Sequence, residues 1–215
     1  MDQAETDPGP TPLRRTPRQA RSRARLALVL QAAERVLVDE GVEALTTTRV
    51  AAEAKVSVGS LYQYLPDRGA IIDALAAGYF TRLEAAMDGL ARAAATERWD
   101  DPVGVLVDAF AGIYRSEHGF RALWFGSGLT ERTRAADREH KRRMADGVRR
   151  VLLALDAADD DEALARACHA ATLAADALAQ EAFRRDPGGD GAVLDEAKVM
   201  LRGYLTAVTS RYRGR

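Results

Sequence analysis

Hydrophobic residues recur at three- and four-residue spacing along most of the chain, which is the period of a helix packed on one face. The first such stripe starts after Arg21 and stops before Gly41, and glycine is common just past a helix C-terminus. The stripe consists of Leu26, Val29, Leu30, Ala33, Val36 and Leu37. We therefore predict a first amphipathic helix from Arg21 to about residue 40.

Two short helices are expected next. Thr46 or Thr47 can cap the first of them through its side-chain oxygen. The buried face of this helix is predicted at Val50, Ala51 and Ala54. Ser57 can cap the second helix, which should run to about Tyr64 because Pro66 cannot continue a helix interior.

Longer helical patterns fill the rest of the chain. We predict six further helices over residues 68 to about 95, 101 to about 115, a shorter one within 118–128, 130–155, one between the acidic stretch 156–162 and the glycine-rich stretch 186–191, and 192–211. Alanine, the strongest helix former, is abundant, and aromatic residues make up only 6% of the chain. The sequence therefore predicts an all-α fold with about nine helices.

Charge is unevenly distributed along the sequence. The formal net charge is −1, so no global field attracts the protein to nucleic acid, but residues 14–25, RRTPRQARSRAR, hold six arginines and no acid. We expect residues 1–20 to form a disordered, basic and proline-rich arm. Two interpretations of the arginines stay open: a solvated tail, or an arm that contacts nucleic-acid phosphate, with Arg18, Arg21 and Arg23 within reach.

Several classes of protein are disfavoured. Cys168 is the one cysteine, which excludes an intrachain disulfide and a cysteine-based zinc site. The acidic N-terminus does not resemble a signal peptide and no apolar run reaches the ~18 residues of a spanning helix, so we expect a cytoplasmic protein. We find no nucleophile elbow, phosphate loop or metal-ligand spacing, and we expect no catalytic residue, no metal and no cofactor.

Residues 47–66, TTRVAAEAKVSVGSLYQYLP, fit a helix-turn-helix, in which two short helices share a small core across a tight turn. Leu61 and Leu65 anchor the second helix inside. The outer side is left with Val58, Gly59, Ser60, Tyr62 and Gln63. Such a helix lies in the DNA major groove, where glutamine pairs with adenine and tyrosine hydroxyls reach phosphate.

The stretch TTTRVAAEAKVSVGSLYQYLPDRGAII resembles the DNA-binding segment of the TetR (tetracycline-repressor) family of bacterial regulators, and the resemblance covers roughly residues 22–75. It implies a three-helix DNA-binding domain over 21–67 and a larger helical domain for ligand binding and dimerisation over 68–215. The residues that it assigns to DNA are Thr47, Ser57, Val58, Gly59, Ser60, Tyr62, Gln63, Tyr64 and Arg68. The DNA backbone is expected to be contacted by Thr47, Tyr62, Tyr64 and Arg68. The bases are expected to be contacted by Val58, Gly59, Ser60 and Gln63.

Other roles stay open for some of these positions. Tyr64 can be mainly a core residue, and Thr47 only a helix cap. We favour a solvated helix residue over a base contact for Arg49. Lys55 occupies the turn, where the family commonly has glycine, and this predicts either a positive φ at Lys55 or a slightly altered turn.

The resemblance also implies a homodimer, because two copies related by a two-fold axis read a palindrome. It places the interface on the last two helices. The alanine-rich face from Leu164 to Ala182 permits close approach of helices, and bulk is expected from Leu201, Tyr204, Leu205 and Val208. Such stripes also serve as ordinary core.

Members of the family usually release DNA when a small molecule binds inside the helical domain. The expected pocket residues are Phe110, Tyr114, His118, Trp124, Phe125, His140, Met144 and His169, each of which can also be core. Few charges fall on the inward faces of the helices over 101–128, which favours an apolar or aromatic ligand. We therefore expect a repressor released by a small molecule; alternatives are a ligand-independent regulator and a protein-interaction adaptor.

Overall fold

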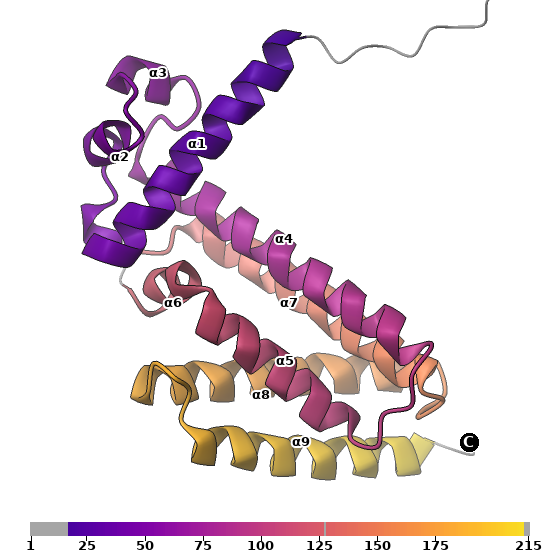
Figure 1. The fold of residues 1–215 in the computed structure, drawn as a ribbon. Helices are drawn as coiled ribbons and strands as arrows, with labels where there is room; N and C mark the ends of the chain where they lie inside the picture. The colour runs from indigo at the N-terminus through magenta and orange to yellow at the C-terminus, as the bar shows by residue number, and fades with distance from the viewer. Residues whose placement is uncertain (1–16, 127, 213–215) are drawn as a thin grey trace, which may run out of the picture.

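Helices joined by short turns make up the part of the chain that the structure, a computed structural model, describes: residues 17–126 and 128–212 (Figure 1). The elements are α1 (Pro17–Glu40), the 3-10 helix η1 (Val42–Ala44), α2 (Thr47–Glu53), α3 (Val58–Tyr62), α4 (Arg68–Ala94), α5 (Pro102–Ser116), α6 (His118–Phe125), α7 (Glu131–Ala154), α8 (Glu162–Arg185) and α9 (Gly191–Tyr212). Over these residues the predicted all-α fold with nine α-helices is confirmed. None of these helices is long and apolar enough to cross a membrane.

Two helix ends differ from the prediction for reasons that involve proline. α1 begins at Pro17, four residues before the expected start at Arg21, and proline is favoured at the first helical position because its φ is already helical. Residues 17–20 of the expected arm are therefore helical, and residues 1–16 lie outside the described part. α3 ends at Tyr62 rather than near Tyr64, although the N–H groups of Tyr64 and Leu65 still bond to the carbonyl of Leu61 at 2.9 Å; Pro66 disfavours helical geometry at Leu65, the residue before it.

Side-chain caps set most helix starts. In each case the capping oxygen accepts the backbone N–H three residues further on. The caps are Thr46, Ser57, Asp67, Asp101, Thr130 and Asp161. The expected cap at Ser57 is confirmed, and of the two candidates before α2 it is Thr46 that caps.

The turn between α2 and α3 is held by a left-handed residue. Lys55 has φ +55°, which confirms the predicted positive φ. The N–H of Val56 bonds to the carbonyl of Ala51 at 3.0 Å, and that of Lys55 to Ala52 at 3.2 Å. This pair of bonds is the Schellman motif that glycine usually closes, and a lysine there costs about 1 kcal/mol.

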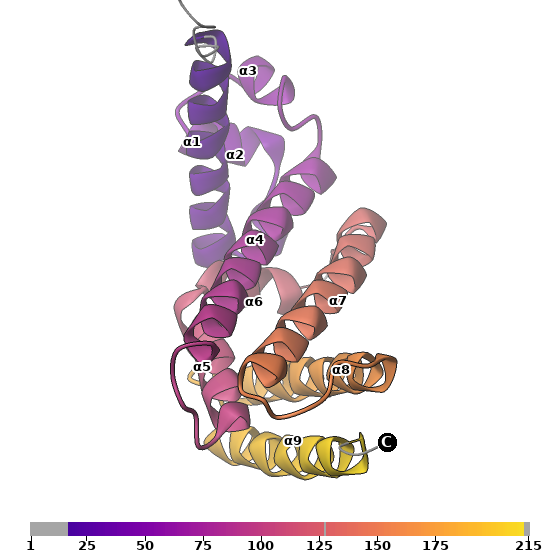
Figure 2. The same cartoon turned by 90° about the vertical axis from the view of Figure 1, so that its right-hand side faces the viewer.

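α4 links two groups of helices. α1, α2 and α3 gather at one end of the molecule, and α8 and α9 lie together at the other (Figure 1). α4 starts just after α3 and runs beside α7 toward α8 and α9, while α6 packs against α1 (Figure 2). A displacement of α4 at one end of the molecule is therefore expected to affect the helices packed on it at the other end.

The stripe expected at a dimer interface is instead largely core of the protomer. Leu164, Ala167, Cys168, Ala171 and Ala182 of α8 are buried, as are Leu201, Leu205 and Val208 of α9. They are buried because α8 and α9 pack on each other and on α5 and α7. Of the bulky residues named, only Tyr204 is exposed, at 40%.

Candidate functional site

The face of α3 that points away from the core carries small and polar side chains. Ser57, Gly59, Tyr62 and Gln63 are exposed, and Ser60 is half-buried. Leu61 is fully buried and holds the helix to the core. Val58 departs from the expected outward position: it is half-buried against the core, because it lies one turn before Leu61 on the same side of the helix.

Gly59 is not required by the protomer. A Cβ added there meets no atom within 4 Å, and its φ lies outside the left-handed region. Glycine inside a helix nevertheless destabilises it by roughly 0.5–1 kcal/mol relative to alanine. Packing within the protomer therefore leaves space for a partner to approach the backbone of α3 closely.

The start of α1 lies against α3 and adds polar groups to this surface. Ser22 donates to the hydroxyl of Tyr64 at 3.2 Å, and the guanidinium of Arg25 donates to Ser60 at 3.5 Å. Tyr64 is half-buried and packs against the core, so it serves packing as well as this contact. Arg25 belongs to the basic stretch, yet no pattern in the sequence indicates that it lies beside α3.

Two further polar contacts involve residues expected at the DNA backbone. Thr47 donates to the hydroxyl of Tyr62 at 3.4 Å, which joins the first turn of α2 to α3. Arg68 donates to the carbonyl of Val42 at 2.9 Å and pairs with Glu43 at 3.1 Å. In the structure the Arg68 side chain therefore ties the start of α4 to η1.

Arg49 lies in a surface ion-pair group. Its guanidinium pairs with Glu53 at 3.2 Å and with Glu40, and Glu53 also pairs with Arg35 at 3.0 Å. The hydrogen bonds that Arg49 donates to Glu40 and, to a smaller extent, to Glu53 raise the pKa of Arg49. These contacts agree with the interpretation of Arg49 as an ordinary helix residue.

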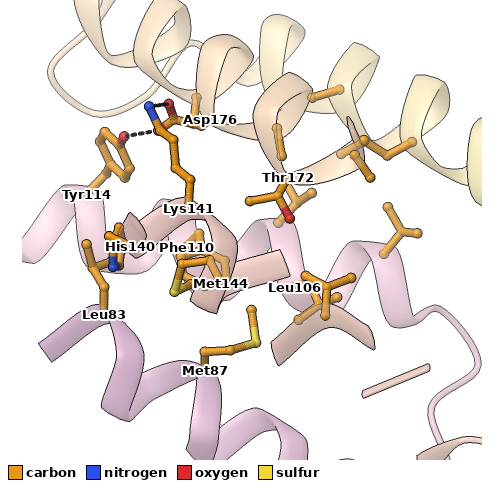
Figure 3. Close-up of a pocket in the computed structure, with 18 of the residues that line it drawn as sticks. Leu83, Met87, Leu106, Phe110, Tyr114, His140, Lys141, Met144, Thr172 and Asp176 are labelled. Carbon is orange, nitrogen blue, oxygen red and sulfur yellow. Dashed lines mark hydrogen bonds and ion pairs between the residues drawn. The ribbon is translucent and has the colours of Figure 1, made fainter. Parts of the chain in front are cut away.

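A second candidate site is a cavity inside the helical domain, with walls from α4 to α9 (Figure 3). Its volume is about 130 Å³, near the size of an apolar cavity that holds a benzene molecule. Most of its surface is aliphatic or aromatic. Phe120 stacks on Trp124 with ring centroids 4.5 Å apart, and Phe80 meets Trp124 edge to face.

Five of the eight expected pocket residues line this cavity: Phe110, Tyr114, Trp124, His140 and Met144. The other three do not. His118 is exposed at the start of α6, and His169 is half-buried outside the lining. Phe125 is half-buried beneath the guanidinium of Arg184, 5.5 Å from its ring centre.

Charged residues in the lining were missed by sequence reasoning. Lys141 of α7 pairs with Asp137 at 2.8 Å and with Asp176 of α8 at 2.9 Å, and all three line the cavity. Burial lowers the pKa of Lys141, but the bond to Asp137 and the charge of Asp176 outweigh it and leave the pKa raised. The available signal was spacing, because Asp137 and Lys141 lie three residues before and one after His140.

His140 is held in one orientation. Its Nδ1 lies 2.8 Å from a carboxylate oxygen of Glu84, and its ring stacks on Phe80 with centroids 4.5 Å apart. Burial lowers the pKa of His140, against the opposing effect of Glu84. The imidazole is therefore neutral at pH 7, and it donates Nδ1–H to Glu84.

Together, an open helix-turn-helix and an internal cavity joined by α4 define a DNA-binding regulator with a separate helical domain. Residues 29–75 match the family model described as bacterial regulatory proteins, tetR family. Residues 97–209, more than half of the chain, match the model described as tetracyclin repressor-like, C-terminal domain. The protein belongs to the TetR family of transcriptional regulators, as the resemblance implied.

Solved structures show the same fold. A TetR-family transcriptional regulator from Streptomyces coelicolor is 29% identical over 87% of this chain and 98% of its own, with a TM-score of 0.66. RolR in complex with resorcinol is 20% identical over 90% and 96%, with a TM-score of 0.57. SmeT in complex with triclosan is 18% identical over 82% and 91%, with a TM-score of 0.56. No curated protein sequence matches the chain.

Proposed function

We propose that this protein represses transcription by binding a palindromic operator as a homodimer, and that a small molecule in the cavity releases it. The observation that carries the proposal is the open face of α3, with a glycine that neither packing nor backbone geometry explains. Double-stranded DNA is a partner that fits this face, because its major groove admits an α-helix and brings the bases close to it.

Base contacts are assigned to the exposed side of α3. Gln63 is placed to pair with adenine, Ser60 to bond several bases, and Gly59 to let the duplex approach. Tyr62 and Thr47, whose hydroxyls lie 3.4 Å apart, are placed to bond phosphate. Arg68 joins them only if it leaves Glu43, so we rank its phosphate contact below theirs.

The dimer is proposed to form through α8 and α9, on faces other than the buried stripe. Leu173 of α8 and Val199, Met200 and Tyr204 of α9 are exposed by 40% to 60% of their surface. α8 and α9 lie at the end of the molecule far from α3 (Figure 1). A two-fold axis there leaves both α3 helices free to enter successive major grooves, roughly 34 Å apart.

Release is proposed to act through α4. Leu83 and Met87 of α4 line the cavity, while Ile71 and Leu75 of the same helix lie in the core shared with α1 and α2. A ligand that binds better when α4 is displaced favours the state that cannot bind DNA, and a ~10⁴-fold preference moves a 1:99 population to 99:1. Resorcinol and triclosan, bound by two proteins of similar fold, are both aromatic.

Selection from a random duplex library tests the proposal, because it does not depend on where the operator lies. The expected result is a palindromic motif bound at least about 10³-fold more tightly than non-specific DNA. Salt should weaken both kinds of binding through counterion release. Enrichment of no motif by the folded protein would contradict the proposal and favour a protein-interaction adaptor.

A further inference from the structure

One wall of the cavity is polar although the remainder is apolar (Figure 3). We call this the polar wall, and it consists of Tyr114, Asp137, His140, Lys141, Thr172 and Asp176. The residues come from α5, α7 and α8, so the wall is a product of the fold and not of one helix. Such side chains are costly to bury, and in a binding cavity they indicate which ligand atoms the site accepts.

The polar wall has a net negative charge, because two carboxylates face one ammonium group. Lys141 is the single cation between Asp137 and Asp176, at 2.8 and 2.9 Å. The side chains of all three are exposed by only 19% to 24%, so water screens the surplus charge incompletely. Glu84, behind His140, does not change this sum because it pairs with Arg143 at 2.9 Å.

The hydroxyl protons of the polar wall are already used. Tyr114 donates to Oδ1 of Asp176 at 3.3 Å, and Thr172 donates to the carbonyl of Cys168 at 2.8 Å. A hydroxyl has one proton, so both oxygens can only accept a further hydrogen bond. Asp176 already accepts three hydrogen bonds, because its Oδ2 also takes Lys141 and, at 2.8 Å, Gln180, so it has less accepting capacity left than Asp137.

α7 adds two acceptor atoms to which none of the described residues donates a hydrogen bond. Asp137 uses Oδ2 toward Lys141, and none of the described residues donates to its Oδ1. His140 uses Nδ1 toward Glu84, which leaves Nε2 of the neutral ring as an acceptor. Asp137 and His140 lie three residues apart on α7 and therefore share one face of the helix.

We propose that the effector is a small amine cation, with its ammonium group at Oδ1 of Asp137 and an aromatic or aliphatic body in the apolar part of the cavity. This rests on the proposed function of the cavity and adds the chemical class of its ligand. A carboxylate is disfavoured because the surplus charge repels it and it brings no donor. A neutral alcohol or phenol brings a donor but gains nothing from the charge.

Two further donors of the lining do not alter this preference. The third N–H of Lys141 belongs to a cation already held between two carboxylates. Trp124 offers an N–H donor, but its ring lies between Phe80 and Phe120 in the aromatic part of the cavity. It therefore suits the body of a ligand rather than its charged group. The ligand is therefore expected to bind with its cationic end at α7 and its apolar end at α4 and α6.

The test compares three probes of one shape, 2-phenylethylamine, 2-phenylethanol and phenylacetate, by calorimetry on the full-length protein at pH 7. We expect the amine to bind at least about tenfold more tightly than the alcohol, and phenylacetate most weakly, since a hydrogen bond to a charged group contributes about 1.5–3 kcal/mol. Asp137→Asn should remove the difference between amine and alcohol. Asp108→Asn, an exposed acid on α5 outside the lining, makes the same change in net charge and should keep it.

Equal binding of amine and alcohol by the unaltered protein, tighter binding of phenylacetate, or no binding of any probe would overturn the inference. The comparison among probes needs no variant, so it stands even if Asp137→Asn does not fold. Selection of an operator from the duplex library is a separate measurement. If the protein selects a palindrome but binds the alcohol more tightly than the amine, the proposed function stands and the proposed amine effector is wrong.

Discussion

At the scale of single residues, Gly59 is the position in α3 whose identity depends most on the partner. Nothing in the protomer lies within 4 Å of a Cβ added there. We predict that Gly59→Ala stabilises the free protein by up to about 1 kcal/mol, because alanine is the better helix former. The same change should weaken operator binding by at least about tenfold, or about 1.4 kcal/mol, because the methyl group meets the duplex.

Urea unfolding and fluorescence anisotropy measure the two effects of Gly59→Ala. Gly112→Ala on α5 is the matched control, since a Cβ there also meets nothing within 4 Å. It should stabilise the protein to a similar extent and leave operator binding unchanged. If Gly59→Ala stabilises the protein and binds the operator with full affinity, the close approach of DNA at α3 is wrong.

His140 makes a pH-dependent contribution to stability. Burial lowers its pKa in the folded protein, so the unfolded chain binds the proton more readily. Its contribution is present above the unfolded value of about 6.5 and is lost as the pH falls below it. We predict that the free energy of unfolding decreases between pH 7 and pH 5.5, measured by urea unfolding at each pH.

His140→Gln should flatten this dependence, because glutamine does not titrate. His118→Gln, at an exposed position, should keep it. A decrease of the same size in His140→Gln would assign the pH dependence to other groups. That result would leave the neutral imidazole assumed for the cavity without support.

Single residues also show where sequence reasoning succeeded and failed. The positive φ of Lys55 is one of the two outcomes expected from the resemblance, because the family commonly has glycine at this turn. The ion pairs of Lys141 did not follow, because Asp137 is local in sequence but Asp176 lies on another helix. Charges in the first half of α7 give the same pattern whether they face water or α8.

At the scale of elements, the helices were predictable because apolar period, caps and prolines are properties of neighbouring residues. The faces through which the helices contact one another were less predictable from the sequence. The stripe of α8 and α9 pointed correctly to packed helices, but it packs within the protomer. The exposed apolar residues of α9, which are Val199, Met200 and Tyr204, make a shorter pattern than the buried stripe.

Those exposed residues support a prediction about assembly. Met200→Asp places a charge in the proposed interface of α8 and α9, where Met200 is 46% exposed in the protomer. Burying an unpaired charge is costly, so we predict a shift from dimer to monomer at micromolar concentration, measured by light scattering. Operator affinity should fall with it, because one recognition helix reads too few bases.

Val105→Asp is the control for Met200→Asp, because Val105 is an exposed apolar residue of α5, at 37%. It should leave the dimer intact. A variant Met200→Asp that remains dimeric would move the interface elsewhere on the protein. An unaltered protein that is monomeric at micromolar concentration would refute the homodimer itself.

At the scale of the whole molecule, contacts between distant helices connect the two sites. Tyr79 and Arg82 of α4 donate to Glu34 of α1 at 3.0 and 3.2 Å. Arg82 also pairs at 2.9 Å with Glu117, at the junction of α5 and α6. A shift of α4 would therefore break contacts on both sides, as a switch between two discrete arrangements requires.

The central claim is that α3 reads DNA bases. The most direct measurement is the affinity ratio between the selected operator and a scrambled duplex, by anisotropy at one salt concentration, for the unaltered protein, Gln63→Ala and Gln31→Ala. Gln31 is an exposed glutamine of α1 and serves as the matched control. We predict that Gln63→Ala lowers this affinity ratio by about 5- to 150-fold, which corresponds to about 1–3 kcal/mol, and leaves binding to the scrambled duplex unchanged. Gln31→Ala should leave the affinity ratio unchanged. An unchanged ratio in Gln63→Ala would contradict the claim.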